Sequence, residues 1–141
     1  MPSSSRFAVA THILTLLAVR GDEPTSSEMI ASSVSTNPVV IRRLLSILSR
    51  SGLVHAVSGR HGGALLARDP REITLYDVYR AVEERNLISL HAASDTKCPV
   101  GRKIHGVLES YCGRAEEAMS KYLRGVTLDQ VVSETEAVVL I

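Results

Sequence analysis

The stretch NPVVIRRLLSILSRSGLVHAVSGRHGGALLA, residues 37–67, predicts one helix followed by a two-stranded hairpin. Asn37 is a favoured N-cap and Pro38 a favoured first-turn residue, so we expect the helix to begin there and to end at the next glycine. Short apolar runs at 53–57 and 64–67 then flank a glycine-rich loop, which is typical of an antiparallel hairpin. The loop lacks the lysine of a phosphate-binding loop and does not open a helix, so we interpret it as a turn.

The two faces of this helix differ in chemistry. At about 100° per residue its apolar residues gather in one arc, which must pack on other helices. The opposite arc holds arginines, serines including Ser46, and Val39, and the helix contains no acidic residue. Arginine can pair with guanine edges, a hydroxyl can reach bases or phosphates, and a valine methyl can contact thymine. We expect this face to contact DNA; the alternatives are a solvated arginine face and a Val39 covered by a neighbouring helix.

Upstream of the quoted stretch, the sequence predicts two further helices. Apolar residues recur at three- and four-residue spacing over about 3–19, before a glycine and a proline. Thr25 stands three residues before Glu28, a capping-box signal for a short helix whose N-terminus, at Thr25 and Ser26, can bind a phosphate. Three helices followed by a hairpin is the order of a winged helix-turn-helix.

Downstream of the hairpin, the pattern is helical again. A helix over roughly 75–85 is followed by a long amphipathic helix over 99–124 and a final helix from Thr127. The expected fold class is therefore mainly α with a small β-hairpin. We divide it into a winged helix-turn-helix DNA-binding domain, residues 1–85, and a helical dimerisation or sensor region, residues 86–141.

Charge is distributed unevenly although the net charge is only +1. Residues 1–71 hold eight arginines and four acidic residues, whereas residues 72–141 hold eight basic and eleven acidic residues. A basic first half suits a polyanion, and arginine suits phosphate and guanine better than lysine does. The alternative is chance unevenness.

The remaining composition argues against a membrane or secreted protein. No apolar run approaches the roughly 18 residues of a membrane span, and Arg6 and His12 interrupt the apolar N-terminal stretch. Two cysteines do not make a disulfide framework. We therefore expect a cytoplasmic protein with no membrane partner.

Several ordered motifs resemble those of the Rrf-type bacterial transcription regulators, the family of IscR, NsrR and CymR, and most closely its YwnA-like branch. They are RFAVATHILTLLA, SSEMIASSVSTNPVVIRRLLSILSRSGLV, GRHGGALLARDPREITLYDVYRAVEE, CPVGRKI and TLDQV. The resemblance implies a homodimer that binds a partly palindromic double-stranded DNA operator, with the third helix in the major groove and the hairpin as a wing in the minor groove. It assigns DNA contacts to Ser5, Arg6, Asn37, Pro38, Val39, Arg42, Arg43, Arg60, His61 and Gly62. It makes the long helix the dimerisation helix, with apolar positions Val100, Ile104, Val107, Leu108, Tyr111, Ala115, Met119 and Tyr122.

The cysteines depart from the family pattern. Many relatives carry an iron–sulfur cluster on three cysteines about six residues apart; counting from Cys98, the matching positions here are Ile104 and Ser110. Cys112 falls off this spacing. We therefore expect no iron–sulfur cluster and no other cofactor, and the histidines show no metal-ligand spacing.

Cys98 is instead a sensor candidate. It stands at the predicted start of a helix beside Lys97, where helix amides and cations favour the thiolate. The hypothesis is that its oxidation releases DNA, and the alternative is a packed structural cysteine. Cys98 with His105 is the nucleophile–base pair that the sequence offers, and two helical turns, about 10 Å, separate them, so we do not expect an enzyme.

The leading prediction is a DNA-binding transcriptional repressor that acts as a homodimer. One alternative is a regulator of the same fold that responds to a small molecule. Another class, a winged-helix module for protein interaction, predicts an acidic or apolar third-helix face, and Arg42, Arg43 and Arg50 argue against it.

Overall fold

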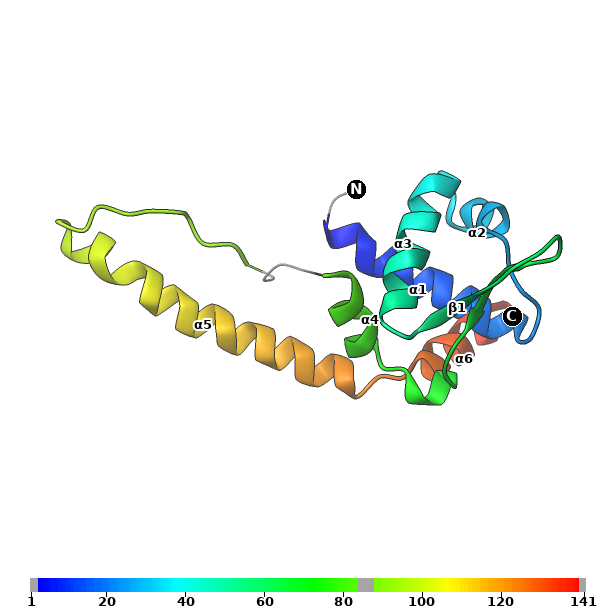
Figure 1. Cartoon of the computed structure of the whole chain (residues 1–141). Helices are drawn as coiled ribbons and strands as arrows, with labels where there is room; N and C mark the ends of the chain where they lie inside the picture. The colour runs from blue at the N-terminus through cyan, green and yellow to red at the C-terminus, as the bar shows by residue number, and fades with distance from the viewer. Residues whose placement is uncertain (1–2, 84–87, 140–141) are drawn as a thin grey trace.

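The computed structural model describes residues 3–83 and 88–139, which form six α-helices and one two-stranded hairpin (Figure 1). The helices are α1 (Ser3–Arg20), α2 (Ser27–Val34), α3 (Pro38–Arg50), α4 (Leu75–Val82), α5 (Pro99–Arg124) and α6 (Leu128–Val139). The strands are β1 (Val54–Val57) and β2 (Gly63–Leu66), and a short 3-10 helix, η1 (Pro70–Glu72), follows them. The expected class, mainly α with a small hairpin in winged-helix order, is confirmed.

The start of α3 follows the prediction because its signals are local. Asn37 is the N-cap, and its Oδ1 accepts a hydrogen bond from the backbone N–H of Val39 at 2.8 Å. Pro38 occupies the first turn, where its missing N–H costs nothing. The apolar face of α3 is buried through Ile41, Leu44 and Leu48.

The start of α2 differs from the prediction. Ser26, not Thr25, is the N-cap, and its Oγ accepts from the backbone N–H of Met29. Thr25 is 0% exposed, and its backbone exchanges hydrogen bonds of 3.1 and 2.9 Å with Ala64 of β2. The Thr25–Glu28 capping box was therefore wrong, because the Thr25 hydroxyl instead accepts from Arg20 and donates to the Glu23 carbonyl.

The hairpin is antiparallel, with Val54 opposite Leu66 and Val57 opposite Gly63. β1 begins one residue later than expected and ends at the expected residue, and β2 begins and ends one residue earlier than expected. A Cβ on Gly63 would lie 2.5 Å from the Thr25 carbonyl group, so only glycine lets the segment before α2 pair beside β2. Backbone hydrogen bonds therefore hold β2 of the wing beside the residues that precede α2.

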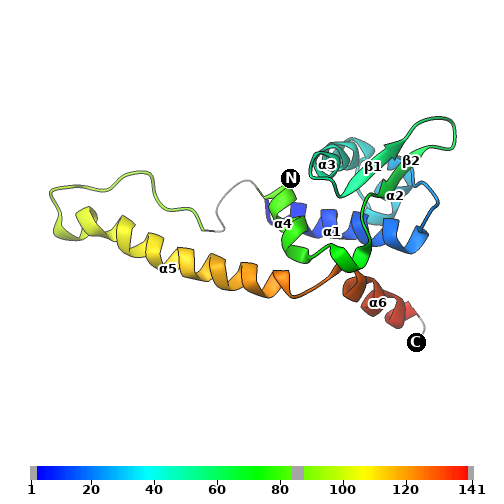
Figure 2. The same cartoon turned by 60° about the horizontal axis from the view of Figure 1, so that its bottom comes forward.

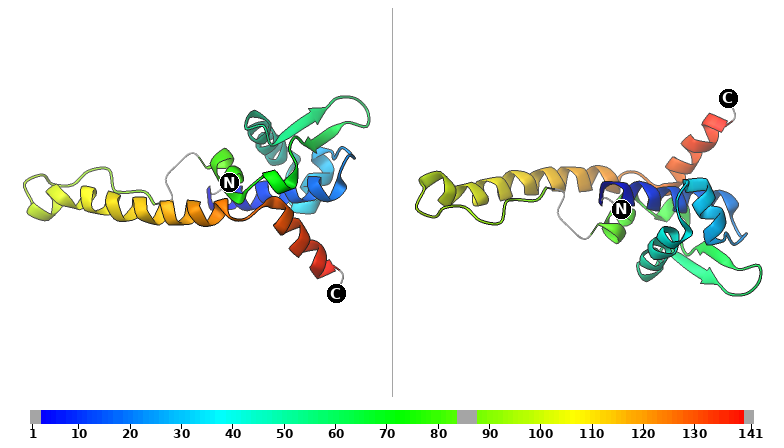
Figure 3. Two further views of the ribbon diagram at one scale, coloured as in Figure 1. Left: turned by 90° about the horizontal axis from the view of Figure 1, so that it is seen from below. Right: turned by 90° about the horizontal axis from the view of Figure 1, so that it is seen from above.

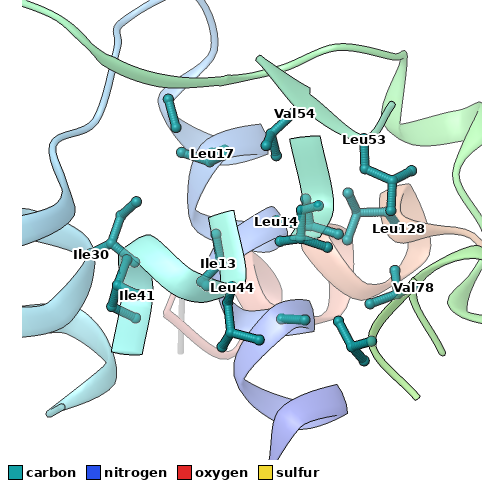
Figure 4. Close-up of a cluster of buried hydrophobic side chains, with 14 of the residues drawn as sticks. Ile13, Leu14, Leu17, Ile30, Ile41, Leu44, Leu53, Val54, Val78 and Leu128 are labelled. Carbon is teal, nitrogen blue, oxygen red and sulfur yellow. The ribbon is translucent and has the colours of Figure 1, made fainter. Parts of the chain in front are cut away.

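The core lies where α1, α3, α4 and the hairpin meet. Figure 4 shows Leu14 of α1, Leu44 of α3 and Val78 of α4 pointing into one apolar cluster, with Leu53 from the start of the hairpin. These side chains are almost fully buried. This cluster holds α3 in place with its other face outward.

The C-terminal helix also enters this core. Leu128 of α6 is 0% exposed and packs in the same cluster. Backbone hydrogen bonds from Leu75 to Val126 and from Leu128 to Ile73 join the start of α6 to the start of α4. The predicted region 86–141 therefore does not pack as one unit, because α6 belongs to the core formed by the first part of the chain.

Helix α5 projects away from the winged-helix core, as Figures 1 and 2 show from two directions. Residues 88–98, which precede α5, run alongside this helix (Figure 3). The ring of His91 in this segment lies 4.4 Å from the ring of His105 in α5. No residue of α5 is fully buried. At its other end, the Arg124 guanidinium lies 4.0 Å from the centre of the Tyr76 ring of α4.

The predicted end of α4 was wrong. Helix α4 ends at Val82, earlier than the expected residue 85. The expected boundary at 85–86 lies outside the described residues. Among the helices that the structure describes, none is long and apolar enough to cross a membrane.

Candidate nucleic-acid interface

A groove of about 400 Å³ lies between the exposed face of α3 and the hairpin. Helix α3 contributes Arg42, Ser46, Ser49 and Arg50, and the hairpin contributes residues 54–57, 63 and 64. Ser27, in the first turn of α2, lines one end. Because the first-turn N–H groups of a helix have no partner within the helix, that end is also suited to an anion.

The exposed face of α3 carries the side chains that the sequence indicated. Arg42, Arg43 and Ser46 are exposed. Val39 is 53% exposed, so the neighbouring helix leaves half of it uncovered. An apolar side chain and arginines on one solvated helix face are what a base-reading surface presents.

The arginines of the first half fall into two sets. Four form ion pairs within the chain: Arg20 with Glu23, Arg42 with Glu28, Arg68 with Asp77, and Arg71 with Asp69. In the described part of the chain, no ion pair involves the other four, which are Arg6, Arg43, Arg50 and Arg60. Arg43 and Arg50 lie on α3 and Arg60 lies at the hairpin tip, so three of the four unpaired arginines are on α3 or the hairpin, and Arg50 lines the groove itself.

The tip of the hairpin exposes Arg60 and His61. Gly62 is half-buried, and a Cβ on it would overlap the carbonyl oxygen of Val57. Its backbone N–H donates to the Gly59 carbonyl at 3.1 Å. Gly62 therefore shapes the turn that presents its two exposed neighbours.

Of the predicted contacts, Thr25, Arg42 and Ser46 line the groove, and the others, which include Val39, Arg43 and Arg60, do not. Ser5 and Arg6, in the first turn of α1, do not line the groove. Thr25 reaches the groove wall but is buried, and its Oγ1 accepts from Arg20 Nε at 2.7 Å. We correct the prediction for Thr25: this side chain holds α1 to the wing and is not accessible to DNA.

Among the groove residues that sequence reasoning did not assign to DNA binding are Arg50 and His55. Arg50 is on the exposed arc of α3, so the helical wheel already contained its signal. His55 is exposed on β1 next to the buried Val54, and strand alternation could have identified it.

Helix α5 presents a different surface. Val100, Val107, Tyr111 and Tyr122 are exposed along it, and Ala115 is exposed on the same stripe. Ile104, Leu108 and Met119 are half-buried. We call these eight residues the α5 stripe. Its side chains recur at three- and four-residue spacing, which is the pattern of a helix that packs on another helix.

Cys98 is the N-cap residue of α5 and is exposed. The backbone N–H groups of Gly101 and Val100, at the start of α5, lower the pKa of its thiol. Cys112 is half-buried fourteen residues further along the same helix. At 1.5 Å per residue the two cysteines are about 21 Å apart, whereas a disulfide needs Cα atoms within about 7 Å.

A three-helix core, a wing and a basic groove between α3 and the wing define a winged-helix DNA-binding protein. A family model for Rrf2, described as an iron-dependent transcriptional regulator, matches residues 3–134. The chain therefore belongs to the Rrf2 family of transcription regulators, and the predicted resemblance is confirmed. Its members are regulators rather than enzymes, as expected.

Individual relatives agree with this assignment. YwnA of Bacillus subtilis, a candidate HTH-type transcriptional regulator, is 43% identical over 92% of this chain and 96% of its own length. The crystal structure of a candidate DNA-binding protein is 42% identical, with a TM-score of 0.74 over 90% of this chain and 98% of that one. The structure of CymR, the global cysteine regulator of B. subtilis, shares the fold at 24% identity, with a TM-score of 0.71 over 95% and 98% of the two chains.

The iron in the family description does not fit the residues of this chain. An iron–sulfur cluster needs closely spaced thiolates, and both cysteines lie far apart on one helix. In residues 3–83 and 88–139, no three His, Cys, Asp or Glu side chains are grouped so that they could hold a metal ion. The donor set therefore does not match an iron centre within one chain.

Proposed function

We propose that the chain is a repressor that binds a partly palindromic operator as a homodimer. In this proposal α3 reads the major groove through Val39, Arg42, Arg43 and Ser46, while Arg60 and His61 enter the minor groove. Asn37 and Pro38 fix the start of α3, and Ser26 and Arg6 contact phosphates. Ser5, in the first turn of α1, also contacts a phosphate.

One observation carries this proposal: three of the four unpaired arginines of the first half lie on α3 or at the tip of the wing, the two elements that form the groove. Arg43, Arg50 and Arg60 have no ion-pair partner in the described residues, whereas Arg68 and Arg71 are neutralised. An unpaired arginine is available to replace the counterions of a phosphate. The family assignment supports DNA as the polyanion.

The α5 stripe supports the homodimer. Exposed tyrosines and valines on a projecting helix are costly in water and are typical of a surface that packs on a protein. A second copy can bury the same stripe by two-fold symmetry. The two α3 helices then meet successive major-groove faces of one operator, which is why we expect a palindrome.

Cys98 is our proposed control point. Its thiolate attacks one oxygen of a peroxide, the O–O bond breaks, and the products are a sulfenic acid and hydroxide or an alkoxide. The added oxygen at the start of α5 alters the packing of the stripe and releases DNA. Operator affinity of the native chain should fall on peroxide treatment and that of Cys98→Ser should not; an equal response of both would refute this control.

We also propose that the chain works without an iron–sulfur cluster or other cofactor. Ile104 and Ser110 stand where related chains place thiolates, and neither side chain ligates iron. The chain purified under anaerobic conditions should contain no stoichiometric iron or acid-labile sulfide and should still bind its operator. Iron and sulfide in equal, stoichiometric amounts would contradict this part.

The proposal is tested by selecting duplexes from a random pool with the native chain and measuring their affinity at two salt concentrations. The affinity should fall steeply with salt, and Arg43→Ala and Arg60→Ala should each reduce it. If no duplex is enriched, or if neither arginine matters, α3 and the wing are not the DNA-binding surface.

A further inference from the structure

Arg42 and Arg43 are neighbours on the exposed face of α3, but only Arg42 has an acidic partner in the described residues. Its Nη2 donates to Oε1 of Glu28, in the first turn of α2, at 2.7 Å. The side chains are 56% and 65% exposed, so this bond lies at the surface and joins the two helices of the helix-turn-helix. An exposed ion pair of this kind contributes little to folding stability.

The ion pair with Glu28 changes how Arg42 can contact DNA in the groove that it lines. A guanidinium has five N–H donors, and the bond to Glu28 uses one, so a two-pronged contact to a guanine edge stays possible. The carboxylate also offsets the positive charge, which weakens attraction to phosphates. Glu28 thus restricts the orientations of Arg42 and reduces its sequence-independent affinity.

The geometry points to Glu28 as a positioning residue for base recognition, an inference that rests on the proposed function. Glu28 holds Arg42 so that its free donors read one guanine in each half-site. Arg50, which lines the same groove and has no ion-pair partner in the described residues, supplies phosphate attraction. Selectivity and general affinity are thereby assigned to different arginines of one helix.

A purely structural role for Glu28 makes a different prediction. A carboxylate in the first turn of a helix interacts favourably with the helix dipole, so its loss would lower stability without changing base preference. A base-preference profile separates the two roles, because helix stability alone has no means of favouring one base pair over another.

The test uses the full chain and a duplex that it selects from a random pool. Affinity is measured by fluorescence anisotropy for that duplex and for all its single base-pair variants, with the native chain, Glu28→Gln, Arg42→Ala and the double variant. Glu72→Gln is the matched control, because it removes the same charge from an exposed residue of η1, which packs beside α6. Thermal unfolding of each variant is recorded in parallel.

We expect Glu28→Gln to lose about tenfold in discrimination at one base pair of each half-site, within the range of a guanine contact. Its affinity for unselected DNA should rise, with a salt slope steeper by about one, because the released Arg42 reaches a phosphate. Arg42→Ala should lose discrimination at the same base pair, and adding Glu28→Gln to it should change nothing further.

The inference is overturned if Glu28→Gln changes the affinity for every duplex by the same factor as Glu72→Gln does. It is also overturned if Glu28→Gln lowers the unfolding temperature and leaves the profile unchanged. If the native chain enriches no duplex, the proposed function itself fails, and that result is visible before any variant is measured.

Discussion

Helices α3 and α5 are both amphipathic, yet they expose opposite faces. α3 buries Ile41, Leu44 and Leu48 and turns arginines and serines outward. α5 leaves its apolar stripe in solvent, with Tyr111 64% and Tyr122 72% exposed. An exposed face is what a partner meets, so the contrast supports the two partners proposed above: DNA for α3 and a second copy of the chain for α5.

The largest effect should follow from placing a charge in the α5 stripe. Val107→Asp introduces a carboxylate that dimerisation would have to bury without a partner, at a cost of several kcal/mol. The variant should sediment as a monomer and bind the operator at least about 100-fold more weakly. Because Val107 is 49% exposed in the single chain, the monomeric variant should keep the helical circular-dichroism spectrum of the native chain.

The control for this substitution is Ser110→Asp. Ser110 is exposed on the same helix but outside the stripe, so this variant should remain a dimer. If Val107→Asp also remains a dimer, the stripe is not the interface and the contrast between the helices fails.

The second-largest loss of operator affinity should occur when an arginine without an ion-pair partner is removed, and not when an ion-paired arginine is removed. Arg43→Ala should weaken operator binding by about 5- to 150-fold, the equivalent of about 1–3 kcal/mol, because it removes a free cation from the exposed face of α3. Arg71→Ala removes the same charge, but Arg71 is bound to Asp69 at 2.7 Å on η1. Anisotropy titrations should show little change for Arg71→Ala, and equal losses for both would mean that only net charge matters.

A single methyl group added at Gly63 should destabilise the wing. Gly63→Ala places a Cβ 2.5 Å from the backbone of Thr25, which should cost roughly 1–3 kcal/mol of folding stability and displace the hairpin. Gly106→Ala in α5 is the matched change, since its Cβ would meet nothing within 4 Å. Chemical denaturation should show destabilisation for the first and stabilisation of up to about 1 kcal/mol for the second; two equal effects would argue against the close approach.

The smallest effect concerns the reactivity of Cys98. Because backbone N–H groups lower the pKa of its thiol, the thiolate should persist to lower pH than in an ordinary cysteine. In a Cys112→Ser background, alkylation by iodoacetamide should therefore stay fast at a pH where N-acetylcysteine has already slowed. Coincident pH–rate profiles for the protein and the free thiol would show that the helix start does not activate Cys98.

The elements that the sequence predicted well have local causes. The N-cap at Asn37, the proline after it and the apolar arc of α3 act within a few residues. The hairpin follows from two short apolar runs and the glycines between them. Such features need no knowledge of the rest of the chain.

The features that it missed depend on residues far apart in sequence. Thr25 is buried because it pairs with Ala64, and Leu128 joins the core because the start of α6 pairs with the start of α4. The Arg42–Glu28 contact depends on how α2 crosses α3. No periodicity or capping rule contains these contacts, so they appear only in the folded chain.

The most direct test of the two-partner account is the mass of the protein–DNA complex, measured by native mass spectrometry on the selected duplex. At a concentration that half-saturates the duplex with native protein, the account predicts two chains per duplex. At that concentration it predicts no second chain for Val107→Asp and almost no complex for the Arg43→Ala, Arg60→Ala double variant. Two chains per duplex with Val107→Asp, or an undiminished complex without the two arginines, would contradict it.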